Sequence, residues 1–141
     1  MPETDGPVIL LVEDEPANRA LVAATLSRSD RLGSVRMLES GTLRSARENL
    51  DTKAIDLVLL DVRLPDGSGL DLVDEIAALP AGRRPRIVIM SASVLPHERE
   101  AALASGANAF LGKPCRPADL VETIASLLPA DRSESVAVSQ G

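Results

Sequence analysis

Short apolar runs that alternate with helical stretches constrain the fold of this chain more than any other feature. The clearest run, Val8–Val12, is apolar at every position and partly β-branched, which is typical of a strand buried on both faces. Similar runs occupy 57–60 and 87–90, and weaker candidates lie at 35–38 and 109–111. A strand buried on both faces needs helices on each side, so the pattern favours an α/β protein.

Apolar residues at helical spacing separate these runs. Such spacing is found at 17–26, 43–50, 72–79 and 117–128, and a helix with fewer large apolar anchors is expected over 96–104. Strand and helix therefore alternate five times, which predicts a doubly wound, five-stranded parallel sheet with five helices. The domain is expected to span 8–128, with an N-terminal extension at 1–7 and a flexible tail at 129–141.

Composition and charge exclude several classes of function. Fifteen Lys and Arg against twenty-one Asp and Glu leave a formal net charge of −6, the wrong sign for gathering nucleic-acid phosphates. Phe110 is the single aromatic residue, so bases would find no stacking platform. No apolar run approaches the ~20 residues of a spanning helix. We expect no nucleic-acid or membrane binding, and the single cysteine, Cys115, favours a reducing, cytoplasmic location.

Polar side chains follow four of the predicted strands at the point where each ends. Glu13 and Asp14 come directly after the first run, Asp61 after the third, Ser91 after the fourth and Lys113 after the fifth. The carboxyl ends of parallel strands share one edge of the sheet, where ligands bind. In the flavodoxin-like order 2-1-3-4-5, Asp61 would lie between the acidic pair and the side that carries the serine and the lysine.

Three carboxylates crowded at one edge would repel one another unless they shared a cation. Oxygen ligands with no His or Cys beside the acidic loops favour Mg²⁺, which also binds phosphate oxygens. A carboxylate beside such an ion can attack phosphorus and form an aspartyl phosphate. Asp61 is the central candidate for this nucleophile, with Lys113 and the Ser91 hydroxyl as partners for the phosphate oxygens.

Each residue also has an ordinary structural interpretation when it is taken alone. Asp14 could cap a helix that begins near Pro16, and Asp61 could be a turn residue at the end of its strand, ahead of the turn sequence at 64–67. The glycines at 67 and 69 do not form a dinucleotide fingerprint, because Leu72 stands where a third glycine is needed, and no Walker motif is present. A nucleotide cofactor is therefore not expected, and only the combination of four strand ends indicates a site.

Four segments of the chain resemble the receiver domain of two-component response regulators. They read VEDEP at 12–16, LLDVRLPDGSG at 59–69, MSA at 90–92 and FLGKP at 110–114, and the similarity extends over roughly 8–128. The resemblance implies that Asp61 is the phosphoacceptor. It also implies a Mg²⁺ site in which Asp14 and Asp61 bind the metal, Glu13 acts through water, and Arg63 offers its backbone carbonyl.

The same resemblance implies a switch around the acceptor. Ser91 would be the switch hydroxyl, Lys113 would read the phosphoryl group, and Phe110 would change rotamer on activation. A cis peptide is implied between Lys113 and Pro114. Arg63, two residues after the acceptor, and Ser93, two residues after the switch hydroxyl, would tune the loss of the phosphoryl group.

The implied function is that of a stand-alone, single-domain response regulator, a switch rather than an enzyme. It would take a phosphoryl group from a phosphohistidine of a sensor histidine kinase or a histidine phosphotransfer protein. The face built from the fourth helix, the fifth strand and the fifth helix would then bind a downstream target or form a homodimer. Two alternatives stay open: a Mg²⁺-dependent phosphohydrolase that uses an aspartyl phosphate, and a pseudo-receiver that is never phosphorylated. The first would want a second carboxylate close after the nucleophile, where Arg63 stands.

Overall fold

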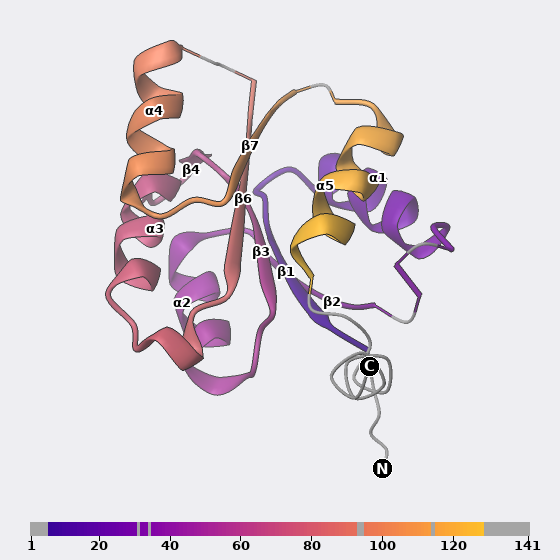
Figure 1. Cartoon of the computed structure of the whole chain (residues 1–141), viewed down its shortest axis with the longest axis horizontal. Coiled ribbons are helices and arrows are strands. Elements are labelled where there is room, and N and C mark those ends of the chain that lie inside the picture. The colour runs from indigo at the N-terminus through magenta and orange to yellow at the C-terminus, as the bar shows by residue number, and fades with distance from the viewer. Residues whose placement is uncertain (1–5, 31, 34, 93–94, 114, 129–141) are drawn as a thin grey trace, which may run out of the picture.

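The computed structural model shows a parallel sheet between two layers of helices (Figure 1). It describes residues 6–30, 32–33, 35–92, 95–113 and 115–128. Its elements in chain order are β1 (Val8–Val12), α1 (Pro16–Ser27), β2 (Arg36–Ser40), α2 (Leu43–Thr52), β3 (Leu57–Asp61), β4 (Arg63–Leu64), β5 (Gly67–Ser68), α3 (Gly69–Ala77), the 3₁₀ helix η1 (Ala81–Arg83), β6 (Arg86–Ser91), α4 (Pro96–Ser105), β7 (Ala109–Gly112) and α5 (Pro117–Leu127).

The five long strands run in the order β2-β1-β3-β6-β7, and every neighbouring pair is parallel. Since β4 and β5 form a separate small hairpin, this order is the flavodoxin-like 2-1-3-4-5, and the predicted fold class is confirmed. Helices α1 and α5 cover one face of the sheet, and α2, α3 and α4 cover the other (Figure 1). Among the described residues, no helix combines the length and apolar character needed to cross a membrane.

Burial of both faces of β1 explains why its sequence is apolar at every position, without alternation. Ile9 and Leu11 pack in the cluster beneath α1 and α5, whereas Leu10 and Val12 pack in the cluster beneath α2, α3 and α4. All four side chains are at most 2% exposed. Burial of both faces stabilises the central strands through the hydrophobic effect and fixes where they end.

Element ends differ from the predicted ones where the apolar pattern fades. The edge strand β2 extends to Ser40, whereas the predicted strand covered 35–38. The prediction ended too early because the exposed Glu39 interrupts the apolar pattern. Helix α3 begins at Gly69, where the hydroxyl of Ser68 accepts a hydrogen bond from the Leu70 N–H at 3.1 Å. The predicted turn at 64–67 lies inside the β4–β5 hairpin. The tail predicted at 129–141 lies outside the described residues.

Candidate functional site

The sheet brings the predicted polar residues to one edge. Glu13 and Asp14 follow β1, and Asp61 ends the neighbouring strand β3. Ser91 ends β6, and Lys113 follows β7. The register places Asp61 level with Met90, one residue before Ser91, so the acidic side and the serine side of the edge adjoin.

Lys113 connects the two central carboxylates. Its Nζ lies 2.6 Å from Glu13 Oε1 and 3.0 Å from Asp61 Oδ2. The three side chains are largely buried, with relative exposures of 19% for Lys113, 5% for Glu13 and 15% for Asp61. Burial disfavours the ammonium, but the hydrogen bonds to Glu13 and Asp61 outweigh it, so the pKa of Lys113 is raised. The lysine therefore stays charged across the physiological pH range.

The acidic residues form a group that fits a hard divalent cation. Glu13, Asp14 and Asp61 each offer one carboxylate oxygen, and these oxygens lie within 4.8 Å of one another. Glu13 is buried, Asp61 is partly buried and Asp14 is exposed, so the group opens to solvent on one side. One ammonium cannot balance three carboxylates, and an all-oxygen donor set suits Mg²⁺.

The acidic loop is held by Arg19 and by the Glu13 carboxylate, which accepts from the Glu15 N–H at 3.2 Å, rather than by an Asp14 helix cap. Glu15, not Asp14, is the N-cap residue of α1, and its side chain accepts no capping hydrogen bond. The Arg19 guanidinium donates through Nη1 to the Glu13 carbonyl at 2.7 Å and through Nε to Glu39 at 3.2 Å. The capping interpretation of Asp14 is therefore wrong, which leaves its carboxylate available to the site.

Arg19 was not identified from the sequence. A basic residue one turn into a helix carries no local signal, because its role depends on contacts with the β1 loop and with β2. Its side chain is 23% exposed, so the hydrogen bond to the Glu13 carbonyl is partly shielded from water. Arg19 is accordingly a positioning residue for the acidic loop.

The loop after Asp61 packs closely against the start of α3. The Arg63 N–H donates to Asp61 Oδ1 at 3.2 Å, whereas Lys113 contacts Oδ2, so both carboxylate oxygens accept a hydrogen bond. The Gly69 N–H donates to the Val62 carbonyl at 2.6 Å. A Cβ at Gly69 would overlap the Asp61 carbonyl oxygen, so only glycine allows this approach. The backbone that follows Asp61 is therefore held against the start of α3.

Asp66 connects this loop to a second helix, α2. Its two carboxylate oxygens accept from the Leu43 N–H at 2.8 Å and the Arg44 N–H at 3.1 Å, at the start of α2. Those hydrogen bonds, that of Leu43 above all, hold the pKa of Asp66 below its ordinary value. Asp66 therefore connects the loop that carries Asp61 to the start of α2. Local sequence patterns did not reveal this contact either.

Ser91 and Phe110 occupy different surroundings. Ser91 is 4% exposed, and its backbone carbonyl accepts from the Lys113 N–H at 2.8 Å. Phe110 is partly buried and packs against the cluster beneath α2, α3 and α4. Pro114, with the predicted cis peptide, and Ser93 lie outside the described residues.

Comparison with curated proteins places the chain among signalling proteins. Two-component response regulator ORR1 of Oryza sativa subsp. japonica is 31% identical over 139 residues, which cover 94% of this chain and 60% of that protein. Signal transduction histidine-protein kinase BarA of Escherichia coli (strain K12) is 29% identical over 75% of this chain and 11% of its own length. The chain thus spans somewhat less than two thirds of the response regulator and about a tenth of the kinase.

Solved structures extend the similarity to metal-bound forms. The receiver domain of sensor histidine kinase PA1611 from Pseudomonas aeruginosa PAO1, with a magnesium ion coordinated in its active-site cleft, is 34% identical. Its TM-score is 0.74, over 86% of this chain and 97% of that one. The Mn²⁺-bound form of response regulator Rcp1 is 26% identical, with a TM-score of 0.72. The similarity covers 88% of this chain and 99% of that one.

The family assignment rests on a match over nearly the whole described domain. The model of the response regulator receiver domain matches residues 9–125. That range contains both core clusters of the sheet and all four strand ends described above. The chain belongs to the receiver-domain family of response regulators, the phosphoacceptor domains of two-component signalling.

Proposed function

We propose that Asp61 accepts a phosphoryl group from the phosphohistidine of a sensor histidine kinase or a histidine phosphotransfer protein. A carboxylate oxygen of Asp61 bonds to phosphorus while the bond from phosphorus to the imidazole nitrogen breaks. The nitrogen keeps the electron pair, and the product on this chain is an acyl phosphate. The observation that carries the proposal is the 3.0 Å contact between Lys113 Nζ and Asp61 Oδ2 inside the acidic group.

The residues around Asp61 supply charge and hydrogen bonds to the incoming group. Lys113 would hold one phosphoryl oxygen as a point charge, since its ammonium already lies beside the acceptor. The Ser91 hydroxyl, at the end of the strand next to β3, would donate to a second oxygen. The Arg63 N–H would keep Asp61 oriented through Oδ1.

Mg²⁺ fits the donor set of the acidic group. We assign Asp14 and Asp61 as direct carboxylate ligands, Glu13 as a ligand through water and the Arg63 carbonyl as a backbone ligand. When bound, the ion would neutralise charge on the transferring phosphoryl group. Arg19 holds the Glu13 carbonyl and so ties the acidic loop to α1. The metal-bound relatives support a divalent cation in this group, and the ligand set rests on the carboxylates themselves.

Signalling would follow from a small movement at the ends of β6 and β7. The register pairs Ser91 with Gly112, and the Lys113 N–H donates to the Ser91 carbonyl, so the two strand ends would move together. Phe110, on β7, would then repack and bias the face formed by α4, β7 and α5. Leu95 and Leu103 are 47% and 40% exposed near α4, and they offer apolar contacts to a downstream target or a second copy.

A protein donor has an apolar surface beside the acceptor to contact. A cavity of about 380 Å³ borders Asp61 and Lys113 and is also lined by α1 and by the start of α5. Leu21, on α1, lines this cavity and is 67% exposed. Protein interfaces combine apolar and polar contacts, so an exposed leucine beside this polar site suits a protein partner. We propose that the transfer takes place in the cytoplasm, which the single cysteine supports.

The proposal is tested by intact-mass spectrometry after incubation with Mg²⁺ and acetyl phosphate. Wild type should gain the mass of one phosphoryl group, and Asp61→Asn should not. Asp51→Asn is the matched control, because Asp51 is an exposed aspartate on α2 outside the acidic group. An equal gain in Asp61→Asn would refute the proposal. Multiple turnover of a phosphomonoester would favour the phosphohydrolase, and a folded wild type that never gains mass would favour the pseudo-receiver.

A further inference from the structure

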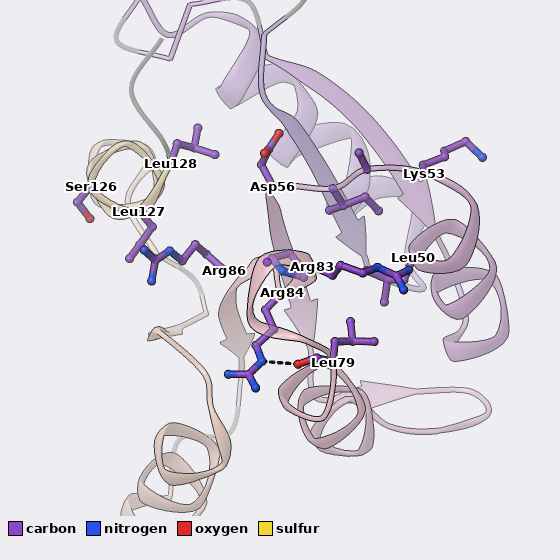
Figure 2. Close-up of a pocket in the computed structure, with 14 residues that line it drawn as sticks. Leu50, Lys53, Asp56, Leu79, Arg83, Arg84, Arg86, Ser126, Leu127 and Leu128 are labelled. Carbon is purple, nitrogen blue, oxygen red and sulfur yellow. Dashed lines mark hydrogen bonds between the residues drawn. The ribbon is translucent and has the colours of Figure 1, made fainter. Parts of the chain in front are cut away.

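A larger cavity lies at the edge of the sheet opposite Asp61 (Figure 2). Its volume is about 510 Å³. It is lined where β3 and β6 begin, by the end of α2, by η1 with its flanking residues, and by the end of α5. None of the residues assigned to phosphoryl transfer lines it.

The floor of this cavity is apolar. Leu50, Ile55 and Leu79 are partly buried and pack against the cluster beneath α2, α3 and α4. Leu127 and Leu128 are partly buried and pack against the other cluster. Both core clusters therefore reach the same opening, and they leave aliphatic side chains in reach of a ligand.

The rim of the cavity is basic in an acidic protein. Among the residues that the structure describes, four basic side chains and one acidic side chain line it. The acidic one, Asp56, already accepts a hydrogen bond from the Val8 N–H at 2.8 Å. The four exposed basic residues are Lys53, Arg83, Arg84 and Arg86. Because the chain as a whole carries −6, this edge has the opposite sign to the rest of the molecule.

The basic groups surround the opening instead of converging on one point. Figure 2 shows Arg86 reaching toward Leu127 and Arg83 reaching toward Leu50. Arg84 lies on a third side, where its Nε donates to the Leu79 carbonyl at 2.7 Å. A single phosphate could not meet all these groups. The arrangement suits an extended ligand that carries several anionic groups along its length.

We propose that this cavity is a docking site for an acidic peptide segment of a partner protein, with aliphatic side chains between its carboxylates. Carboxylates would pair with the rim, and the aliphatic groups would cover the leucine floor. A nucleic-acid backbone would use the rim but leave that floor unpaired. The site is separate from Asp61, so the proposal does not depend on phosphorylation.

The test is a binding titration followed by fluorescence anisotropy. The probe is a labelled peptide in which glutamate alternates with leucine, and the protein is the full chain. The Arg83→Glu/Arg86→Glu double variant should weaken binding by about tenfold or more, because it replaces attraction with repulsion at two rim positions. The matched control is Arg28→Glu/Arg99→Glu, which changes the net charge equally at two exposed arginines that do not line the cavity. Circular dichroism should show that both double variants fold.

The outcomes separate the proposal from simpler explanations. Loss of binding in the rim variant together with near wild-type binding in the control variant supports it. Equal weakening in both variants would mean that net charge alone attracts the peptide, and the docking site would be rejected. Equally tight binding of a peptide with glutamine for glutamate, or with glycine for leucine, would reject the stated ligand chemistry. Tighter binding of duplex DNA than of the peptide, or no binding of the peptide to wild type, would also overturn the proposal.

Discussion

Lys113 Nζ lies 3.0 Å from Asp61 Oδ2, although 52 positions separate the two residues in the sequence. The same ammonium lies 2.6 Å from Glu13 Oε1, 100 positions away. One cation therefore holds two carboxylates that would otherwise repel each other at the end of β1 and β3. Its removal should change the stability of the domain as well as its chemistry.

Lys113→Met keeps the length of the side chain and removes its charge. Glu13 and Asp61 would then face each other without a counter-charge, and we expect the free energy of unfolding to fall by about 1–3 kcal/mol, less than for a fully buried pair. Phosphorylation by acetyl phosphate should slow by about 10²-fold, because a positioned cation is lost. Urea unfolding followed by circular dichroism and intact-mass kinetics measure the two effects. An unchanged phosphorylation rate would contradict the role assigned to Lys113.

Alkaline pH should remove the contribution of the Lys113 charge to the unfolding free energy of the wild-type protein. Burial opposes the charge of Lys113, but its carboxylate partners raise its pKa above the ordinary 10.5. Because the pKa of Lys113 is higher in the folded than in the unfolded protein, its charge stabilises the fold fully at pH values below the unfolded pKa. This stabilisation is lost as the pH rises through the folded-state pKa. The stability difference between wild type and Lys113→Met should therefore shrink above pH 10.5. A constant difference would show that the charge of Lys113 is not its source.

Gly69→Ala should strain the backbone beneath the acceptor. The added methyl would overlap the Asp61 carbonyl oxygen, and we expect a loss of about 1–3 kcal/mol in unfolding free energy. Gly82→Ala is the matched control, since a Cβ there meets nothing within 4 Å, and it should stay within about 0.5 kcal/mol of wild type. Equal stability of the two variants in urea unfolding would count against the close packing of the acceptor loop.

Asp66→Ala should destabilise the start of α2. Both backbone N–H groups at Leu43 and Arg44 would lose their carboxylate acceptor. Since the pKa of Asp66 is held below 3.8, its contribution is present above that pH and is lost as the pH falls through the folded value. Thermal unfolding should show a lower midpoint for Asp66→Ala at neutral pH and a smaller difference in acid. Asp51→Ala, at an exposed position near the other end of α2, should not lower the midpoint.

Asp14→Asn should separate metal binding from folding. Asp14 is exposed and its loss relieves repulsion in the acidic group, so the unfolding free energy should stay equal or rise. Mg²⁺ affinity should fall by about tenfold or more, because a charged direct ligand is lost. Isothermal titration calorimetry suits this chain, which has no Trp or Tyr to report binding by fluorescence. An unchanged affinity would remove Asp14 from the ligand set.

The central strands were predictable because burial leaves a local signal. β1, β3 and β6 are buried on both faces, and their apolar runs mark them within one residue at each end. The edge strand β2 carries exposed Arg36 and Glu39, so its end at Ser40 was missed. The two-residue strands β4 and β5 are too short to give any periodic pattern.

The candidate site was predictable as a set of residue types but not as a set of contacts. Once the strand order is known, the carboxyl edge of the sheet must collect Glu13, Asp61 and Lys113. Arg19 acts through the Glu13 carbonyl and Glu39, and Asp66 acts through the N–H groups of α2; these contacts follow only from the folded backbone. Sequence patterns therefore predict which residue types gather at this edge, and the structure shows which contacts position them.

The identity of the phosphorylated atom is tested most directly by trapping the product. Protein treated with acetyl phosphate and Mg²⁺ is reduced with borohydride, which converts an aspartyl phosphate to homoserine, and the modified position is mapped by peptide mass spectrometry. We predict homoserine at position 61 and nowhere else in the chain. Homoserine at another aspartate, or a phosphoryl group that stays on Ser91 through the reduction, would contradict the assignment of Asp61 as the acceptor.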